Sequence, residues 1–182
     1  MKDITYITGN KKKAEYLANL LDFPILHHKV DLDEIQSMDL RKIVKHKVRQ
    51  AYGIIKKPVI VEDTILEFKG LGRLPGPFIK FFLEQMPEED ICSLLNGKDR
   101  SATARCVFGY FDGEKEVYFE GSMDGTIAEK PAGDGGYGFD RIFIPEGFNV
   151  TRAEQNEEDH KKVYLKIKPI LQLKEFLLTL KN

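Results

Sequence analysis

The chain has 182 residues, enough for one domain or for two small lobes that share a core. Its composition, 42% hydrophobic and 31% charged, is that of an ordinary globular protein, and its net charge of −1 gives no bulk attraction to nucleic acid or to a membrane surface. No apolar run approaches the roughly 20 residues of a membrane span, and the start is too short and polar for a signal peptide. We expect Cys92 and Cys106 to be reduced, in a cytoplasmic protein.

The first half of the chain alternates short strands with amphipathic helices. Strands are predicted at 4–8 and 23–32 and within 57–68, and helices at 11–23, 39–55 and 88–98 and, after a Pro-Gly-Pro turn, within 74–86. The run from Val59 to Val61 is almost continuously apolar, which suits a strand buried on both faces.

From Ser101 on, the pattern predicts two or three antiparallel strands, with hairpin turns at Asp112-Gly113 and Asp124-Gly125. A glycine-rich loop follows over 131–143, and then a last helix that Pro169 should break or kink. The succession of strands and helices predicts an α/β fold.

The stretch TGNKKK is the first candidate site. Its three lysines, Lys11 to Lys13, stand at a predicted helix start, where the helix dipole disfavours cations unless an anion is present. Gly9 and Asn10 tolerate left-handed backbone angles, so the turn can aim N–H groups at a phosphate. A solvated basic helix start is an equally good interpretation of this segment alone.

Carboxylates form the second candidate site. Glu62 and Asp63 close an apolar strand, and Glu34 follows the preceding predicted strand. Open α/β sheets keep their sites at such strand ends, and Mg²⁺ binds few carboxylates together with substrate phosphates. Taken alone, ordinary turn acids are the simpler interpretation.

The glycine-rich loop is the third candidate, because it sets Tyr137 and Phe139 beside Asp140. An aromatic ring that stacks on a base contributes roughly 1–3 kcal/mol, and the carboxylate could accept a hydrogen bond from the base. The alternative is an aromatic strand that enters the core through a glycine hinge. The basic residues of the 39–55 helix are interpreted by default as a solvated face, from which one lysine could be directed at phosphate.

Together these cues favour a nucleoside triphosphate site. The sequence contains no G-x-x-x-x-G-K-[ST] and no G-x-G-x-x-G motif, so the common NTPase and dinucleotide folds are disfavoured.

Three motifs, TGNKKKAEYL, VEDTILEFKGLGRLPGPFIKFFLE and GGYGFDRIF, resemble in this order the inosine triphosphate pyrophosphatase family, in its eukaryotic-type version. Members of that family hydrolyse inosine and xanthosine triphosphates to monophosphate and pyrophosphate. The long central motif is specific, and the resemblance runs from Ile4 to about Phe176.

The resemblance implies a fold and an assembly. The fold is α/β, with a long curved mixed sheet flanked by helices and two lobes around a central cleft. A single domain, 1–182, would divide roughly into 1–70 with 140–182, and 71–139. A cytoplasmic homodimer that binds neither nucleic acid nor membrane is expected.

The resemblance also implies residue roles. Asp63 and Lys13 would be catalytic, Asp63 orienting or deprotonating the attacking water, and Glu34 and Asp63 would hold Mg²⁺. Phe139 would stack on the base. The substrate contacts would come from Thr8, Gly9, Asn10, Lys11, Lys12, Lys13, Lys45, Asp63, Thr64, Lys80, Tyr137, Gly138, Phe139, Asp140 and His160.

One family motif is not retained. The family reads the 6-oxo group of the purine with a Ser-His-Arg triplet, and an ungapped match places Tyr164-Leu165-Lys166 there. Leu165 cannot donate a hydrogen bond from its side chain, and Lys166 lacks the guanidinium fork. The expected function is therefore a Mg²⁺-dependent nucleoside triphosphate pyrophosphatase whose base specificity is relaxed or redirected.

Two other functions stay open at this point. One is a divergent nucleotide-binding protein with little or no turnover. The other is a nucleic-acid-binding module on the 39–55 helix, which the near-zero net charge disfavours.

Overall fold

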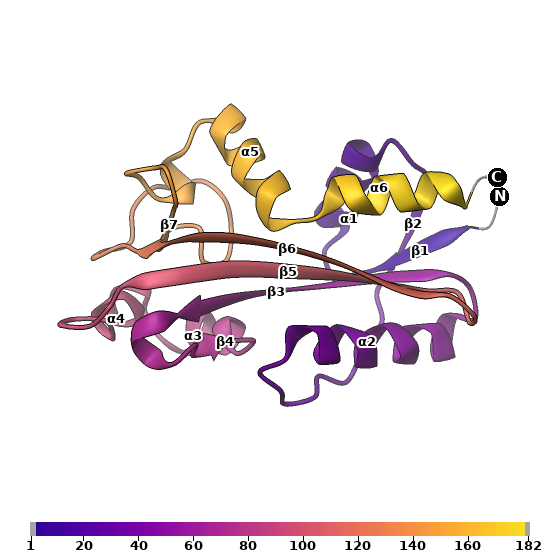
Figure 1. Cartoon of the computed structure of the whole chain (residues 1–182), viewed down its shortest axis with the longest axis horizontal. Coiled ribbons are helices and arrows are strands. Elements are labelled where there is room, and N and C mark those ends of the chain that lie inside the picture. Colours follow the sequence, from indigo (N-terminus) through magenta and orange to yellow (C-terminus); the bar gives the residue numbers. More distant parts are fainter. Residues whose placement is uncertain (1–2, 181–182) are drawn as a thin grey trace. The chain divides into compact units, whose positions relative to one another are not determined.

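The structure, a computed structural model, describes residues 3–180, and of Lys12 only the backbone (Figure 1). Its strands form one mixed sheet in the order β2-β1-β3-β5-β6-β7, with β4 paired to β3. The strands are β1 (Ile4–Ile7), β2 (Ile25–His28), β3 (Val59–Phe68), β4 (Pro75–Gly76), β5 (Ser101–Phe111), β6 (Glu116–Ile127) and β7 (Phe143–Pro145).

Helices flank this sheet, which confirms the expected α/β fold with a mixed sheet. The α-helices are α1 (Lys11–Leu21), α2 (Leu40–Ile55), α3 (Ile79–Gln85), α4 (Glu88–Ser93), α5 (Glu157–Ile167) and α6 (Ile170–Thr179), with short 3₁₀ helices η1 (Lys69–Leu71) and η2 (Arg152–Glu154). None of the helices in the described part of the chain is both long and apolar enough to cross a membrane.

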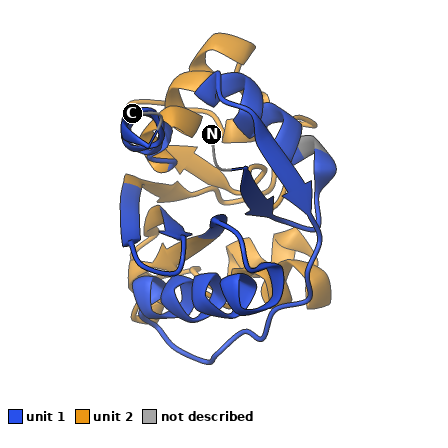
Figure 2. Ribbon diagram, turned by 90° about the vertical axis from the view of Figure 1, so that its right-hand side faces the viewer, with its two compact units in different colours: residues 1–63, 106–121, 168–182 blue, residues 64–105, 122–167 orange. Residues whose placement is uncertain are grey.

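The chain forms two compact units (Figure 2). Of the described residues, unit 1 holds 3–63, 106–121 and 168–180, and unit 2 holds 64–105 and 122–167. The sequence-based division instead joins 140–182 to the first 70 residues. The boundaries differ because β3, β5 and β6 each contribute to both units, and because β7 pairs with the part of β6 that lies in unit 2.

In unit 1, β1 lies between two parallel neighbours, β2 and β3. Helices α1 and α6 pack together on one side of the strands, and α2 lies on the other (Figures 1 and 2). Because helices cover both faces of the sheet here, β1 is buried along its whole length, and its sequence is mostly apolar. On α2, the buried stripe includes Ile43, Val44, Val48 and Ala51.

The last predicted helix is two helices, as the proline indicates. α5 ends at Ile167 and α6 begins at Ile170, with Pro169 in the N-cap position. Proline has no N–H to donate to the preceding turn, and here the result is a break between two helices instead of a kink in one.

Of the two predicted hairpin turns, one is confirmed and one is wrong. Asp112-Gly113 lies between β5 and β6, with Gly113 at φ +101°. Asp124-Gly125 lies inside β6, where Gly125 pairs with Pro145 of β7. A Cβ on Gly125 would lie 2.2 Å from the Ile144 carbonyl oxygen, so this glycine permits close strand approach instead of a turn.

Candidate functional site

The carboxylates interrupt a buried strand. The residues from Glu62 to Thr64 are half-buried, between fully buried segments of β3. The sequence predicts these acids at a strand end, which is wrong, because β3 continues to Phe68. The strand that does end nearby is the neighbouring β1, which stops at Ile7. Because Tyr6 of β1 pairs with Ile60 of β3, the turn that follows β1 begins beside Glu62.

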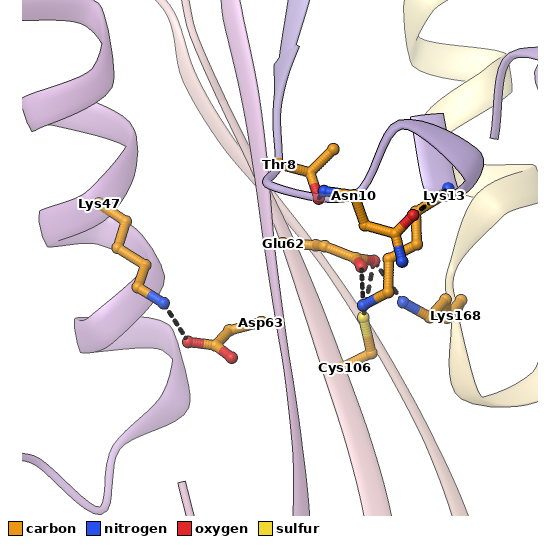
Figure 3. A network of polar contacts seen from close by, with 8 residues as sticks. All are labelled: Thr8, Asn10, Lys13, Lys47, Glu62, Asp63, Cys106 and Lys168. Carbon is orange, nitrogen blue, oxygen red and sulfur yellow. Dashed lines mark hydrogen bonds and ion pairs between the residues drawn. The ribbon is translucent and has the colours of Figure 1, made fainter. Parts of the chain in front are cut away.

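Glu62 and Asp63 point to opposite faces of β3 (Figure 3), as consecutive strand residues do. Glu62 meets Lys13 of α1 and Lys168, which lies between α5 and α6. Asp63 meets Lys47 of α2. The two acids therefore belong to two separate clusters.

On the Glu62 face, two ammonium groups share one enclosed carboxylate. Lys168 Nζ donates to Glu62 Oε2, and Lys13 Nζ lies 3.7 Å from Oε1. The side chains of Glu62 and Lys168 are 9% and 6% exposed, against 32% for Lys13. Burial alone would raise the pKa of the Glu62 carboxyl, but Lys168 and Lys13 outweigh it and hold this pKa below its usual range.

On the Asp63 face, one ammonium joins two carboxylates. Lys47 Nζ donates to Glu34 Oε1 at 2.6 Å and to Asp63 Oδ2 at 2.8 Å. Burial would lower the pKa of Lys47, but the carboxylates of Asp63 and Glu34 together raise it. Lys47 therefore stays charged and joins the two carboxylates in one place.

Sequence reasoning missed Lys47, although a signal exists. It lies on the buried stripe of α2 beside Val44, Val48 and Ala51, so its spacing is that of a core residue. A charged residue on an apolar stripe needs a partner, because an isolated buried charge is strongly unfavourable. The sequence does not say which acids supply it.

The TGN turn is built by polar contacts with β2. Thr8 donates its N–H to the His28 carbonyl at 3.2 Å, and the His27 ring lies 2.7 Å from the Thr8 carbonyl, to which its Nε2–H can donate. Asn10 donates its N–H to Thr8 Oγ1 and caps α1 by accepting from the Lys13 N–H.

The TGN turn does not use the left-handed backbone angles that Gly9 and Asn10 tolerate. Asn10 is extended at φ −113°, and Gly9 is not among the described residues at positive φ. A Cβ on Gly9 would meet nothing within 4 Å. Neither the backbone angle nor the packing of the described chain therefore requires glycine at this position.

The remaining predicted phosphate contacts are spread over both units. In unit 1, Lys11 pairs with Glu15 on the exposed side of α1, and Lys45 lies 3.9 Å from Glu116. The Lys12 side chain lies outside the described residues. In unit 2, Thr64 continues β3, and the exposed Lys80 pairs with Glu84 on α3 at 3.8 Å.

The glycine-rich loop of unit 2 presents one aromatic ring and buries the other. Tyr137 is 51% exposed, whereas Phe139 is 8% exposed and packs edge-on against Phe143. Gly138 has φ +64°, and a Cβ added there would meet nothing within 4 Å.

Asp140 is an internal support of this loop. It is 2% exposed, and it accepts from Arg152 Nη1 at 2.7 Å and from the Tyr137 N–H at 3.0 Å. His160 Nε2 of α5 lies 3.3 Å from Arg152 Nη2 and 3.5 Å from Asp140 Oδ2. Sequence reasoning missed Arg152, because a lone arginine outside any motif gives no signal.

The positions of the lost triplet lie along α5. Tyr164 is buried, Leu165 is half-buried and Lys166 is exposed. Their side chains offer no copy of a histidine–arginine pair.

The donor set on the Asp63 face fits Mg²⁺. Among residues 3–180, no group of three or more His, Cys, Asp or Glu side chains is placed to hold a metal ion. Mg²⁺ does not need one, because it commonly takes one or two carboxylates and completes its shell with water and phosphate oxygens. Glu34 and Asp63 are hard oxygen donors that already converge on one cation, the Lys47 ammonium.

Comparison with known proteins places the chain in a family. The family model described as the Ham1 family matches residues 4–176. The chain belongs to the Ham1 family. This membership confirms the resemblance carried by the three sequence motifs.

Relatives of this Ham1 family chain span almost its whole length. Inosine triphosphate pyrophosphatase 2 of Trypanosoma cruzi is 42% identical, over 94% of this chain and 90% of the relative. Inosine triphosphate pyrophosphatase of Schizosaccharomyces pombe is 36% identical, over 100% of this chain and 98% of the relative. A solved HAM1 protein from Coxiella burnetii has a TM-score of 0.85 over 98% of this chain and 100% of that one, at 23% identity, and shows the fold alone.

Proposed function

We propose that this protein is a Mg²⁺-dependent nucleoside triphosphate pyrophosphatase, which hydrolyses inosine- and xanthosine-type triphosphates to monophosphate and pyrophosphate. Its family membership and the names of its relatives support this proposal. The observation that carries it is that the carboxylates of Glu34 and Asp63 both contact the Lys47 ammonium. By the pairing of β1 with β3, Asp63 lies next to the strand position at which the TGN turn begins.

The TGN turn and the start of α1 would bind the phosphates. A helix N-terminus presents N–H groups and a positive dipole end to an anion, and Lys13 adds a charge. The open space at Gly9 lets a phosphate approach the backbone. Thr64 and the lysines at 11, 12, 45 and 80 are proposed as further phosphate contacts by family resemblance.

Glu34 and Asp63 would hold Mg²⁺, which when bound neutralises phosphate charge and acts as a Lewis acid. Asp63 would orient the attacking water and accept its proton. Lys47 holds the Asp63 carboxylate in position before substrate arrives, because its ammonium donates a charge-assisted hydrogen bond to it.

Phe139 and Tyr137 would contact the base by family resemblance. Asp140 would contribute through loop shape, because both of its oxygens already accept hydrogen bonds. His160, which is about a quarter exposed and rests on Arg152 and Asp140, would contact the nucleoside. A cytoplasmic homodimer is also proposed on resemblance alone.

A turnover panel tests this function and its base preference. The purified protein with Mg²⁺ meets inosine, xanthosine, guanosine, adenosine, uridine and thymidine triphosphates, and monophosphate and pyrophosphate are measured separately. Asp63→Asn is the inactive control, and Asp90→Asn, an exposed acid on α4, is the matched control that keeps activity. Binding of nucleotide by folded protein without pyrophosphate release would favour the non-catalytic alternative.

A further inference from the structure

Glu62 has two ammonium partners of different kinds. Lys168 donates directly to Glu62 Oε2, is 6% exposed, and lies with its ammonium 5.8 Å from the centre of the Phe108 ring. Lys13 lies 3.7 Å from the other oxygen, beyond hydrogen-bond distance, and is 32% exposed. Figure 3 shows the two lysines approaching the carboxylate from α1 and from the chain before α6.

The enclosed carboxylate cannot remain without a counter-ion, because an unpaired buried charge is strongly unfavourable. Lys168 is the counter-ion that the structure provides at hydrogen-bond distance. With Lys168 at hydrogen-bond distance from Glu62, Lys13 is the more distant of the two ammonium partners of this carboxylate, and it stands in the first turn of α1.

We propose that Lys168 is a positioning residue for phosphate binding: it is the hydrogen-bonded counter-ion of Glu62 and so keeps the Lys13 ammonium from moving closer to that carboxylate than its present 3.7 Å. The inference rests on the proposed function, because it assigns Lys13 to the substrate phosphates. Without Lys168, Glu62 draws Lys13 into a close ion pair, and the phosphates compete with a carboxylate for the same ammonium.

A purely structural ion pair makes a different prediction. If Lys168 only anchors the chain before α6 to β3, its loss lowers stability and leaves phosphate affinity unchanged in the folded protein. If Lys168 contacts phosphate itself, its loss weakens binding whether or not Glu62 is charged.

Three variants separate these cases: Lys168→Met, Glu62→Gln, and the double variant with both changes. The measurements are kcat and KM for inosine triphosphate with Mg²⁺, calorimetric binding of inorganic triphosphate, and the midpoint of thermal unfolding. Lys168→Arg, which keeps the charge, is the conservative control and should bind nearly as the wild type does.

We expect Lys168→Met to raise KM and to weaken inorganic triphosphate binding by about tenfold or more, the scale of one charged hydrogen bond, with a smaller change in kcat. The double variant regains most of this affinity, because no uncompensated carboxylate remains to capture Lys13. If Lys168→Met does not fold, Glu62→Gln and the double variant should bind inorganic triphosphate equally well.

Two results overturn the inference: unchanged KM and binding in folded Lys168→Met, or a double variant that binds more weakly than Glu62→Gln. Failure of the proposed function looks different. In that case the wild type releases no pyrophosphate from any nucleotide, while the inorganic triphosphate measurements still report on the lysine cluster.

Discussion

Glu62 and Asp63 are consecutive residues of β3, and each is held by lysines on the opposite face of the strand from the other. One cation cannot be shared by both carboxylates when their side chains point apart. Glu62 and Asp63 therefore cannot form one metal site, although they are adjacent in the sequence. The carboxylate proposed to hold Mg²⁺ together with Asp63 is Glu34, which contacts the same Lys47 ammonium.

This division predicts different metal responses for the two acids. In Glu62→Gln the Mg²⁺ concentration for half-maximal activity should stay near that of the wild type, even where KM for nucleotide changes. Asp63→Asn should lose activity by a factor of about 100 or more at any Mg²⁺ concentration, because it removes both an oxygen ligand and the proton acceptor. A large shift of the Mg²⁺ midpoint in Glu62→Gln would contradict the division.

Replacing the ammonium between the two acids should increase the effect of Mg²⁺ on stability. Lys47→Met leaves Glu34 and Asp63 without their shared cation, so the variant should be less stable without metal. Added Mg²⁺ should then raise its thermal midpoint by more than it raises that of the wild type, because binding to the native state stabilises it. The control is Lys57→Met, which removes the charge of an exposed lysine that follows α2. An equal Mg²⁺ response in all three proteins would argue against metal binding at this pair.

Gly9 gives a test of the phosphate turn that does not disturb the fold. A Cβ there meets nothing within 4 Å, and the backbone is not left-handed, so Gly9→Ala should unfold at nearly the wild-type temperature. It should nevertheless raise KM for the triphosphate severalfold, because the methyl group obstructs close approach of a phosphate to the backbone. Wild-type KM in this variant would show that the open space is not used by substrate.

Two neighbouring glycines in the loop of unit 2 should respond differently to alanine. Gly136 has φ +72°, and its Cβ would lie 2.2 Å from Asp140 Oδ2, so Gly136→Ala combines backbone strain with disruption of the buried carboxylate. Gly138 has φ +64° but open space, so Gly138→Ala carries the backbone strain alone, about 1 kcal/mol. Urea unfolding should show the larger loss for Gly136→Ala, by roughly 1–3 kcal/mol more. Equal losses would mean that the loop rearranges freely around Asp140.

Local signals predicted the fold and the family well. Apolar spacing located the helices and strands of unit 1, the proline located the break before α6, and the three motifs identified the family. These features depend on residues close together in the chain, which is why one sequence was enough.

The rest of the site depends on tertiary contacts. Glu62 and Lys168 are more than a hundred residues apart, and the packing of α6 against α1 and against Tyr110 and Phe119 of the sheet brings the end of the chain to β3. Lys47 and Arg152 acquire meaning only from the acids they meet in space. Asp124-Gly125 has the composition of a turn, but the partner strand β7 makes it part of a ladder.

The most direct test of the proposed function is pyrophosphate release from inosine triphosphate by the wild type and by Asp63→Asn, with Mg²⁺ and after its removal by a chelator. We expect equal amounts of monophosphate and pyrophosphate from the wild type with Mg²⁺, and almost none from the variant or without the metal. Undiminished release by folded Asp63→Asn, or release of orthophosphate in place of pyrophosphate, would contradict it.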